Sequence, residues 1–180
     1  MGVLFDYFAA GSDSEAGSVI DRAGGPGFQT VQVSPPTGGK RGLFGRKRAT
    51  PQPLTTDPGL VAFDTVSVKG IDPVVQLGTL EELLTSRPYD DVVNDPRAGQ
   101  TVASRDGGER LVCTITDSLT TALARASDEE LQRVALPWSQ TEEFWGDADP
   151  EELTQILGEL AGLARRAQAN GHRLYCWVCV

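Results

Sequence analysis

The sequence has 180 residues, with 16 Lys and Arg against 25 Asp and Glu, and a formal net charge of −9. This length suits one domain, and no apolar run approaches the length of a membrane-spanning helix. The acidic balance disfavours nucleic acid as the partner of the folded body. Three cysteines are an odd number and too few for a disulfide scaffold, so we expect a reducing, cytoplasmic setting.

The chain begins with an apolar segment over residues 3–8 that predicts a strand, and a further strand is expected over 29–33. Between them stands the first of several capping pairs, in which Ser, Thr or Asp precedes Glu by three residues. Such a pair satisfies two free backbone donors at the start of a helix. The pairs are Ser12/Glu15, Thr79/Glu82, Ser127/Glu130, Ser139/Glu142 and Asp149/Glu152.

The segment 34–58 is rich in Pro and Gly, with five of the 11 Pro and four of the 20 Gly. This composition is incompatible with regular structure. We therefore predict one domain over 1–180, interrupted at 34–58 by a disordered insertion, with both flanking parts contributing to one core. Five basic residues against Asp57 give the insertion a net charge of +4, which leaves −13 for the remainder.

The insertion is also a candidate binding segment, because an apolar pair lies between its basic residues. It would suit phosphates, an acidic protein or an anionic membrane, although five such charges give only weak membrane binding at about 1 kcal/mol each. The alternative is a flexible insertion without a role. The residues concerned are Lys40, Arg41, Phe44, Arg46, Lys47 and Arg48.

Beyond the insertion, strands are expected over 61–68 and 110–116. The Asp106-Gly107 turn would fold residues 100–105 back onto the second of these strands. The clearest helix spans 150–169, because Pro150 occupies its first position and Asn170-Gly171 ends it. The final segment, 172–180, is apolar on both faces, which predicts a central strand. We expect an α+β fold with one sheet of about four to six strands and helices packed on it.

Cys176 and Cys179 have the CxxC spacing of redox and zinc sites. In a strand, however, residues three apart point to opposite faces and lie roughly 10 Å apart, too far for a disulfide. Together with Cys113 they are candidates for a thiol or metal site, and buried structural cysteines are the favoured interpretation. His172, the only histidine, follows the long helix. The partial negative charge at the C-terminal end of that helix would stabilise its imidazolium form.

Two acidic groups are candidates for metal binding or acid–base catalysis. The first lies largely in the first turns of the expected helices, where carboxylates offset the helix dipole, so solvated faces are the favoured interpretation. The groups are Glu142, Glu143, Asp147, Asp149, Glu151 and Glu152, and Asp90, Asp91 and Asp95.

The stretch 136–145 contains two of the three Trp beside carboxylates, a combination typical of recognition surfaces. It gives the candidate partner-binding residues Trp138, Glu142, Glu143, Phe144 and Trp145. The alternative makes Trp138 a hydrophobic staple before a helix capped by Ser139 and places Trp145 in the core.

The opening MGVLFDYF, and the long helix that leads into residues 171–177, resemble small actinobacterial proteins with no assigned activity. The resemblance extends over most of the chain outside 34–58. It implies a bacterial cytosolic α+β protein and assigns no site residue.

From these observations we expect a non-enzymatic, acidic protein-interaction module without a cofactor, such as an inhibitor, an immunity-type protein or a regulatory partner. An acidic body suits a basic protein and speeds its capture by electrostatic steering. Two alternatives remain open. One is a thiol or metal protein that uses Cys113, Cys176 and Cys179, and the other is a carboxylate-based enzyme.

Overall fold

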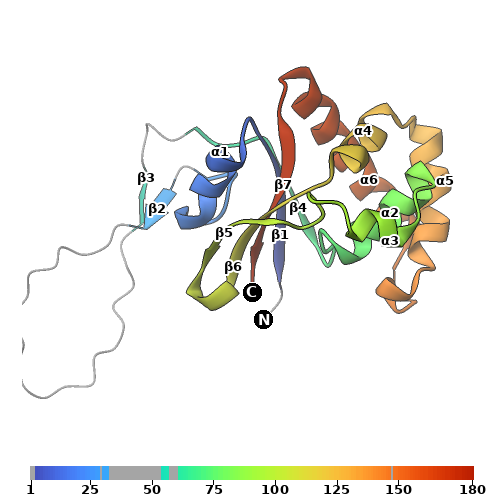
Figure 1. Cartoon of the computed structure of the whole chain (residues 1–180), viewed down its shortest axis with the longest axis horizontal. Helices are drawn as coiled ribbons and strands as arrows, with labels where there is room; N and C mark the ends of the chain where they lie inside the picture. The colour runs from blue at the N-terminus through green and yellow to red at the C-terminus, as the bar shows by residue number, and fades with distance from the viewer. Residues whose placement is uncertain (1–2, 29, 33–53, 57–60, 147) are drawn as a thin grey trace, which may run out of the picture.

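A computed structural model describes residues 3–28, 30–32, 54–56, 61–146 and 148–180. Its main feature is a five-stranded antiparallel sheet with the order β4-β1-β7-β6-β5 (Figure 1). The strands are β1 (Leu4–Ala10), β4 (Thr65–Lys69), β5 (Thr101–Arg105), β6 (Arg110–Thr114) and β7 (Arg173–Cys179). The predicted α+β class is confirmed, and the C-terminal strand lies in the centre, as predicted.

Strand β7 is central because both of its faces are apolar. Leu174 and Cys176 are buried on one face of the sheet, and Tyr175 and Trp177 on the other. Its neighbours β1 and β6 pair with it along nearly its whole length. A strand buried on both faces needs cover on both sides, and the two sides are covered very differently.

Helices cover one face, which we call the helical face (Figure 1). The long helix α6 packs against α4 and α5 and against strands β1, β4 and β7. Its apolar stripe includes the buried Leu157, Leu160 and Leu163. The helices on this side are α2 (Val75–Thr85), α3 (Tyr89–Val93), α4 (Asp117–Arg125), α5 (Asp128–Ser139) and α6 (Pro150–Ala169).

The other face, which we call the α1 face, has a thinner cover. It carries the short helix α1 (Asp13–Gly17) and the 3-10 turn η1 (Ser18–Asp21). Beneath them lie the buried Phe8, Val112 and Tyr175, with Phe63 packed edge-on against Phe8 at 5.4 Å between ring centroids. Figure 1 shows α1 on the side of the sheet opposite to the large helices.

Several capping predictions are confirmed. Ser12, Ser127 and Asp149 each accept a backbone N–H from the first turn of their helices. Helix α6 begins at Pro150 and ends before Asn170, as predicted. Gly171 adopts the left-handed conformation, with φ 67°, that is typical of the residue after a helix end.

Two capping predictions are wrong. Thr79 lies inside α2, which starts four residues earlier because Asp72 Oδ1 accepts the backbone N–H groups of Val74 and Val75 at 2.8 and 2.9 Å. Ser139 is the last residue of α5 rather than the cap of a new helix, and only the 3-10 turn η3 (Glu142–Phe144) follows it.

The strand predictions need smaller corrections. Within 61–68 only the second half is a strand, whereas the hairpin of β5 and β6 around the 3-10 turn η2 (Asp106–Gly108) forms as predicted. A separate two-stranded ribbon pairs β2 (Thr30–Gln32) with β3 (Leu54–Thr56). Strand β3 falls within 34–58, so that end of the segment has regular structure, because its backbone pairs with β2. Residues 34–53, 57 and 58 lie outside the described residues.

No helix within the described ranges is long and apolar enough to cross a membrane.

Candidate functional site

The structure separates the two tryptophans of the predicted partner-binding stretch. Trp138 lies within α5 and is 0% exposed; its indole Nε1–H donates to the Gln76 carbonyl oxygen at 2.9 Å. Phe144 packs edge-on against it, with ring centroids 5.1 Å apart. The prediction that Trp138 contacts a partner is therefore wrong, as is its alternative role as a staple before a helix, because packing against α2 buries the ring.

Trp145, in contrast, is 88% exposed and is not part of the core. It follows η3 directly, and its backbone N–H donates to the Glu142 carbonyl at 3.0 Å. Its φ of 58° lies in the left-handed region, which costs a non-glycine residue roughly 1–2 kcal/mol. The side chain is thus held in solvent by a fixed turn.

The turn is attached to the body of the protein. Gln76 Nε2 on α2 donates to the carbonyl oxygen of Glu143 at 3.0 Å, and Phe144 is wedged against Trp138. The Glu142 side chain is exposed and that of Glu143 is half-buried. Along the chain, both carboxylates directly precede Phe144 and the exposed Trp145.

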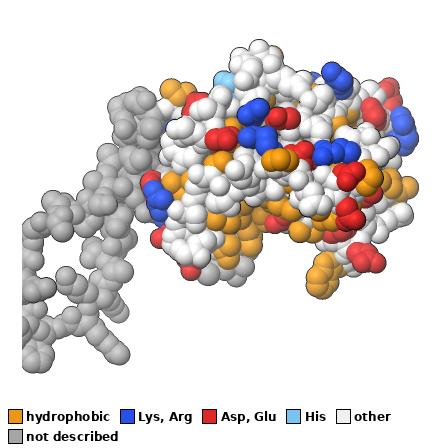
Figure 2. Space-filling model, viewed as in Figure 1, with side chains coloured by type: hydrophobic (Ala, Val, Ile, Leu, Met, Phe, Trp, Pro, Cys, Tyr) orange, Lys and Arg blue, Asp and Glu red, His pale blue; other side chains and the backbone are white. Residues whose placement is uncertain are grey.

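Two grooves lie at this end of the molecule and meet at Lys69 and Gly70. The larger, of about 650 Å³, is lined by the apolar residues 3–5 around the start of β1 and by residues between Lys69 and Gln76. The smaller, of about 230 Å³, runs between Phe144 and α6. Figure 2 shows hydrophobic side chains gathered along this lower edge, with acidic side chains beside them.

We define the Trp145 surface as the exposed indole together with the acidic side chains that flank it and the smaller groove. Its acidic members come from η3 and from the start of α6. They are Glu142, Glu143, Asp149 and Glu152. Asp147, which sequence reasoning grouped with them, lies outside the described residues.

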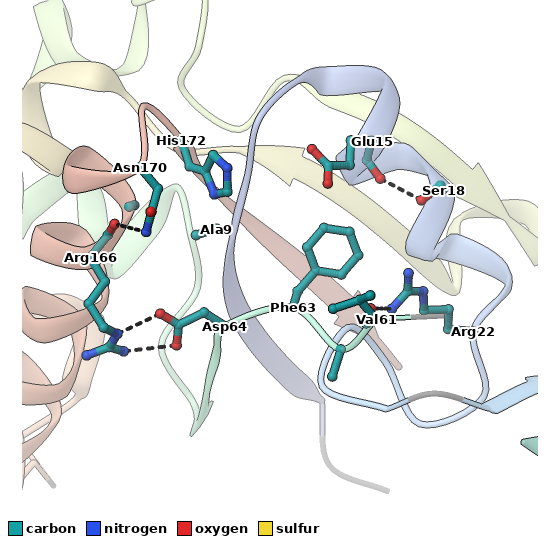
Figure 3. A pocket seen from close by; sticks show the side chains of 12 residues that line it. Ala9, Glu15, Ser18, Arg22, Val61, Phe63, Asp64, Arg166, Asn170 and His172 are labelled. Atoms are coloured by element: carbon teal, nitrogen blue, oxygen red, sulfur yellow. Dashed lines mark hydrogen bonds and ion pairs between the residues drawn. The ribbon is translucent and has the colours of Figure 1, made fainter. Parts of the chain in front are cut away.

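A second hollow, of about 380 Å³, opens at the other end of the sheet, where β1 ends and β4 begins (Figure 3). On one wall Arg166 of α6 holds Asp64 through two bonds, of 2.6 and 3.0 Å. On the opposite wall lie Arg22, from the end of η1, and Phe63. Sequence reasoning missed this site because four separate segments contribute to it.

Arg22 is unusual in this second hollow because it is only 6% exposed. Its Nη1 donates to the Val61 carbonyl at 2.8 Å, and its guanidinium lies 4.6 Å from the centroid of the Phe63 ring. Within the described ranges its Nε has no hydrogen-bond partner. Burial lowers the pKa of Arg22, and the nearby charge of Glu15 acts in the opposite sense.

His172 faces the same hollow. Its backbone N–H donates to the Ala167 carbonyl at 2.8 Å and so helps to end α6, whereas the imidazole lines the pocket near the Glu15 carboxylate. Among the described residues no hydrogen-bond partner of the imidazole is found. The interaction of its ring with the helix end stays a prediction.

The three cysteines are free. Cys113 and Cys176 lie opposite each other on the neighbouring strands β6 and β7 and are buried on the helical face, whereas Cys179 lies on the α1 face. Burial, reinforced by the neighbouring Cys113, raises the pKa of the Cys176 thiol well above its usual range. A protonated, inaccessible thiol is a poor nucleophile and a poor metal ligand, so this arrangement supports structural cysteines.

The described residues contain no group of three or more His, Cys, Asp or Glu side chains placed to hold a metal ion. Of the second acidic group, Asp95 pairs with Arg87 at 3.2 Å. The same arginine pairs at 3.0 Å with Glu81, a buried carboxylate that also accepts the hydroxyl groups of Thr116 and Ser118. These interactions join α2 to α4, and they already engage the carboxylates of Glu81 and Asp95.

The basic candidates lie outside the described residues, so the hypotheses about them stay predictions. They are Lys40, Arg41, Phe44, Arg46, Lys47 and Arg48.

No family model matches the sequence, and neither the curated proteins nor the solved structures include a match to it.

Proposed function

We propose that this chain is a non-enzymatic interaction module that binds a basic protein through the Trp145 surface, as an inhibitor, an immunity-type protein or a regulatory partner. The single observation that carries this proposal is the 88% exposure of Trp145 on a turn that is itself fixed. Three cysteines, an odd number and too few for a disulfide scaffold, favour a reducing cytoplasm as its location.

The cost of the Trp145 conformation supports the proposal. A large aromatic side chain in water forgoes the gain of burial, and its left-handed backbone adds strain. Glycine at this position would avoid both costs, and Gly146 is the next residue. Strained residues cluster at binding sites, and tryptophan is among the residues that contribute most to protein interfaces.

The charge of the Trp145 surface supports a basic partner. The Trp145 surface carries four carboxylates, and among the described residues Lys69 is the only basic one that lines the two grooves beside it. The chain outside 34–58 has a net charge of −13. The matching partner presents Lys or Arg side chains around an apolar depression that accepts the indole, and opposite charges speed its association.

The test is affinity capture with wild type, Trp145→Ala and Phe28→Ala, followed by titration of each variant with the purified captured protein. Phe28 is a matched control because it is an aromatic residue, 57% exposed, in the turn next to Gly24 and Gly25 on the α1 face. We expect Trp145→Ala to weaken binding about 30-fold, which corresponds to about 2 kcal/mol, and Phe28→Ala to leave it unchanged.

The charge component is tested in the same titration. Binding of the wild type should weaken as salt is raised, and Glu142→Gln combined with Glu143→Gln should reduce this salt dependence. Equal affinities of wild type and Trp145→Ala for every captured protein would overturn the proposal. So would a captured partner whose contact surface is acidic.

A further inference from the structure

The pocket of about 380 Å³ between β1, β4, α1 and α6 carries an inference independent of the Trp145 surface. Its volume falls in the range of small-molecule sites. Apolar side chains, including Phe63 and Val61, form part of its wall, and charged groups from different segments converge on it (Figure 3). A ligand would be held by those charged groups that still have bonding capacity.

Asp64 and Arg166 have little capacity left, because they bind each other through both carboxylate oxygens. Arg22 differs, since its buried guanidinium bonds to a carbonyl oxygen and lies on an aromatic ring, without a carboxylate within ion-pair distance among the described residues. A buried cation without an anion is costly. An anionic group in the pocket would therefore be stabilised beside Arg22.

Glu15 supplies the opposite charge. Its Oε2 accepts the backbone N–H of Gly11 at 2.8 Å, and no other bond of its carboxylate is found in the described part of the chain. A methyl group placed on Gly11 would lie 3.1 Å from this oxygen and 3.6 Å from the ring of His172. The Glu15 carboxylate and the imidazole are therefore close together at the rim of the pocket.

The opposite charges of Arg22 and Glu15 determine which charges a ligand must carry. A simple carboxylate would be attracted by Arg22 and repelled by Glu15, and a simple amine would experience the reverse. A small molecule that carries both charges satisfies both groups. We propose that the pocket binds a small zwitterion of the α-amino acid class, with its carboxylate towards Arg22, its ammonium group towards Glu15 and its side chain against Phe63.

The experiment uses the full-length chain and isothermal titration with the common L-amino acids at concentrations up to about 10 mM. The tightest ligand is then compared with its carboxamide, which lacks the anion, and with its N-acetyl form, which lacks the cation. We expect each derivative to bind at least about tenfold more weakly than the parent, a loss of about 1.4 kcal/mol.

A matched pair of variants separates the pocket from the rest of the surface. Glu15→Gln removes the charge but keeps an oxygen for Gly11, and Glu159→Gln makes the same change on the exposed side of α6, outside the pocket. Glu15→Gln should weaken the parent amino acid about tenfold and leave the N-acetyl form bound at least as well as by wild type.

Three results would overturn the proposal. The first is the absence of binding by any amino acid over the tested range. The second is equal binding of the parent and its two derivatives. The third is an equal loss of affinity in Glu15→Gln and Glu159→Gln. Because Trp145 takes no part in any of these measurements, none of the results bears on partner binding.

Discussion

The two faces of the five-stranded sheet both carry buried apolar side chains, but they are covered by different structures. On the helical face, α6 and its neighbours bury a continuous apolar core, and the buried Glu81 has Arg87, Thr116 and Ser118 as partners. On the α1 face, one short helix, a 3-10 turn and a glycine-containing turn form most of the cover.

The difference is clearest in the buried polar atoms. In the described part of the chain, the buried side-chain atoms without a hydrogen-bond partner belong to Arg22, Arg97 and Trp177, and the side chains of all three lie on the α1 face against Phe63, Tyr175 or the main sheet. A buried polar group without a partner costs stability, so this face is the weaker one. We infer that the helical face stabilises the fold, whereas the α1 face has spare bonding capacity for a ligand.

The largest expected effect compares apolar truncations on the two faces. Leu160→Ala on α6 should lower the free energy of unfolding by about 3–5 kcal/mol, because close-packed helices leave a cavity that cannot collapse. Ile20→Ala in η1 should cost about 2 kcal/mol, since a one-turn cover relaxes more easily. Urea unfolding measures both. A larger loss in Ile20→Ala would reverse the ranking of the faces.

A second comparison uses the two buried tryptophans. Trp138→Phe removes the indole donor to Gln76, whereas Trp177→Phe removes an indole N–H that has no hydrogen-bond partner among the residues the structure describes. Both changes lose similar apolar area, so the hydrogen bond should make Trp138→Phe more costly by about 1 kcal/mol. The two variants are compared by urea unfolding. Equal losses would mean that the Trp138 hydrogen bond contributes nothing.

Two carboxylates of the α1 face should affect stability with opposite signs. Burial raises the pKa of Asp6 above its ordinary 3.8, although a hydrogen bond with Ser67 opposes this. The unfolded chain therefore loses this proton at lower pH, and the Asp6 contribution to stability falls as pH rises between the ordinary and the raised pKa. Asp6→Asn should accordingly raise the unfolding midpoint at neutral pH.

Asp13 behaves in the reverse way. A hydrogen bond from the Tyr175 hydroxyl, together with Arg97, lowers the pKa of Asp13, so its contribution is present above 3.8 and is lost as the pH falls towards the lowered pKa. Asp13→Asn should destabilise the protein at neutral pH by less than about 1 kcal/mol, because the carboxylate is half exposed. Unfolding midpoints measured from acidic to neutral pH test both variants, and shifts of the same sign would contradict the assignment.

The smallest effect concerns Trp145. Replacing it by Gly removes an exposed side chain and relieves the left-handed backbone, so the free energy of unfolding should rise by up to about 1 kcal/mol. Partner binding should be lost in the same variant. Destabilisation by this substitution would show that the indole supports the fold.

Local signals predicted the parts of the fold that depend on neighbouring residues. Asp149-Pro150 and Asn170-Gly171 fixed both ends of α6, because caps act within one turn. The apolar alternation of 172–180 placed β7 in the centre of the sheet. The hairpin at Asp106 also depends only on adjacent residues.

Features that depend on distant residues were not predicted. Helix α5 continues through Pro137 to Ser139 because Trp138 is buried against α2, and no local pattern shows that contact. The pocket beside Arg22 joins segments from α1, the start of β4 and the end of α6. Only the folded chain brings these charges together.

We propose that Trp145 is the contact point for a basic protein. This is tested by quantitative mass spectrometry of proteins retained from native lysate by wild type, Trp145→Ala and Phe28→Ala at low salt. We expect at least one basic protein that wild type and Phe28→Ala retain equally and that Trp145→Ala retains at least about tenfold less. Retention of the same proteins in equal amounts by all three would contradict it.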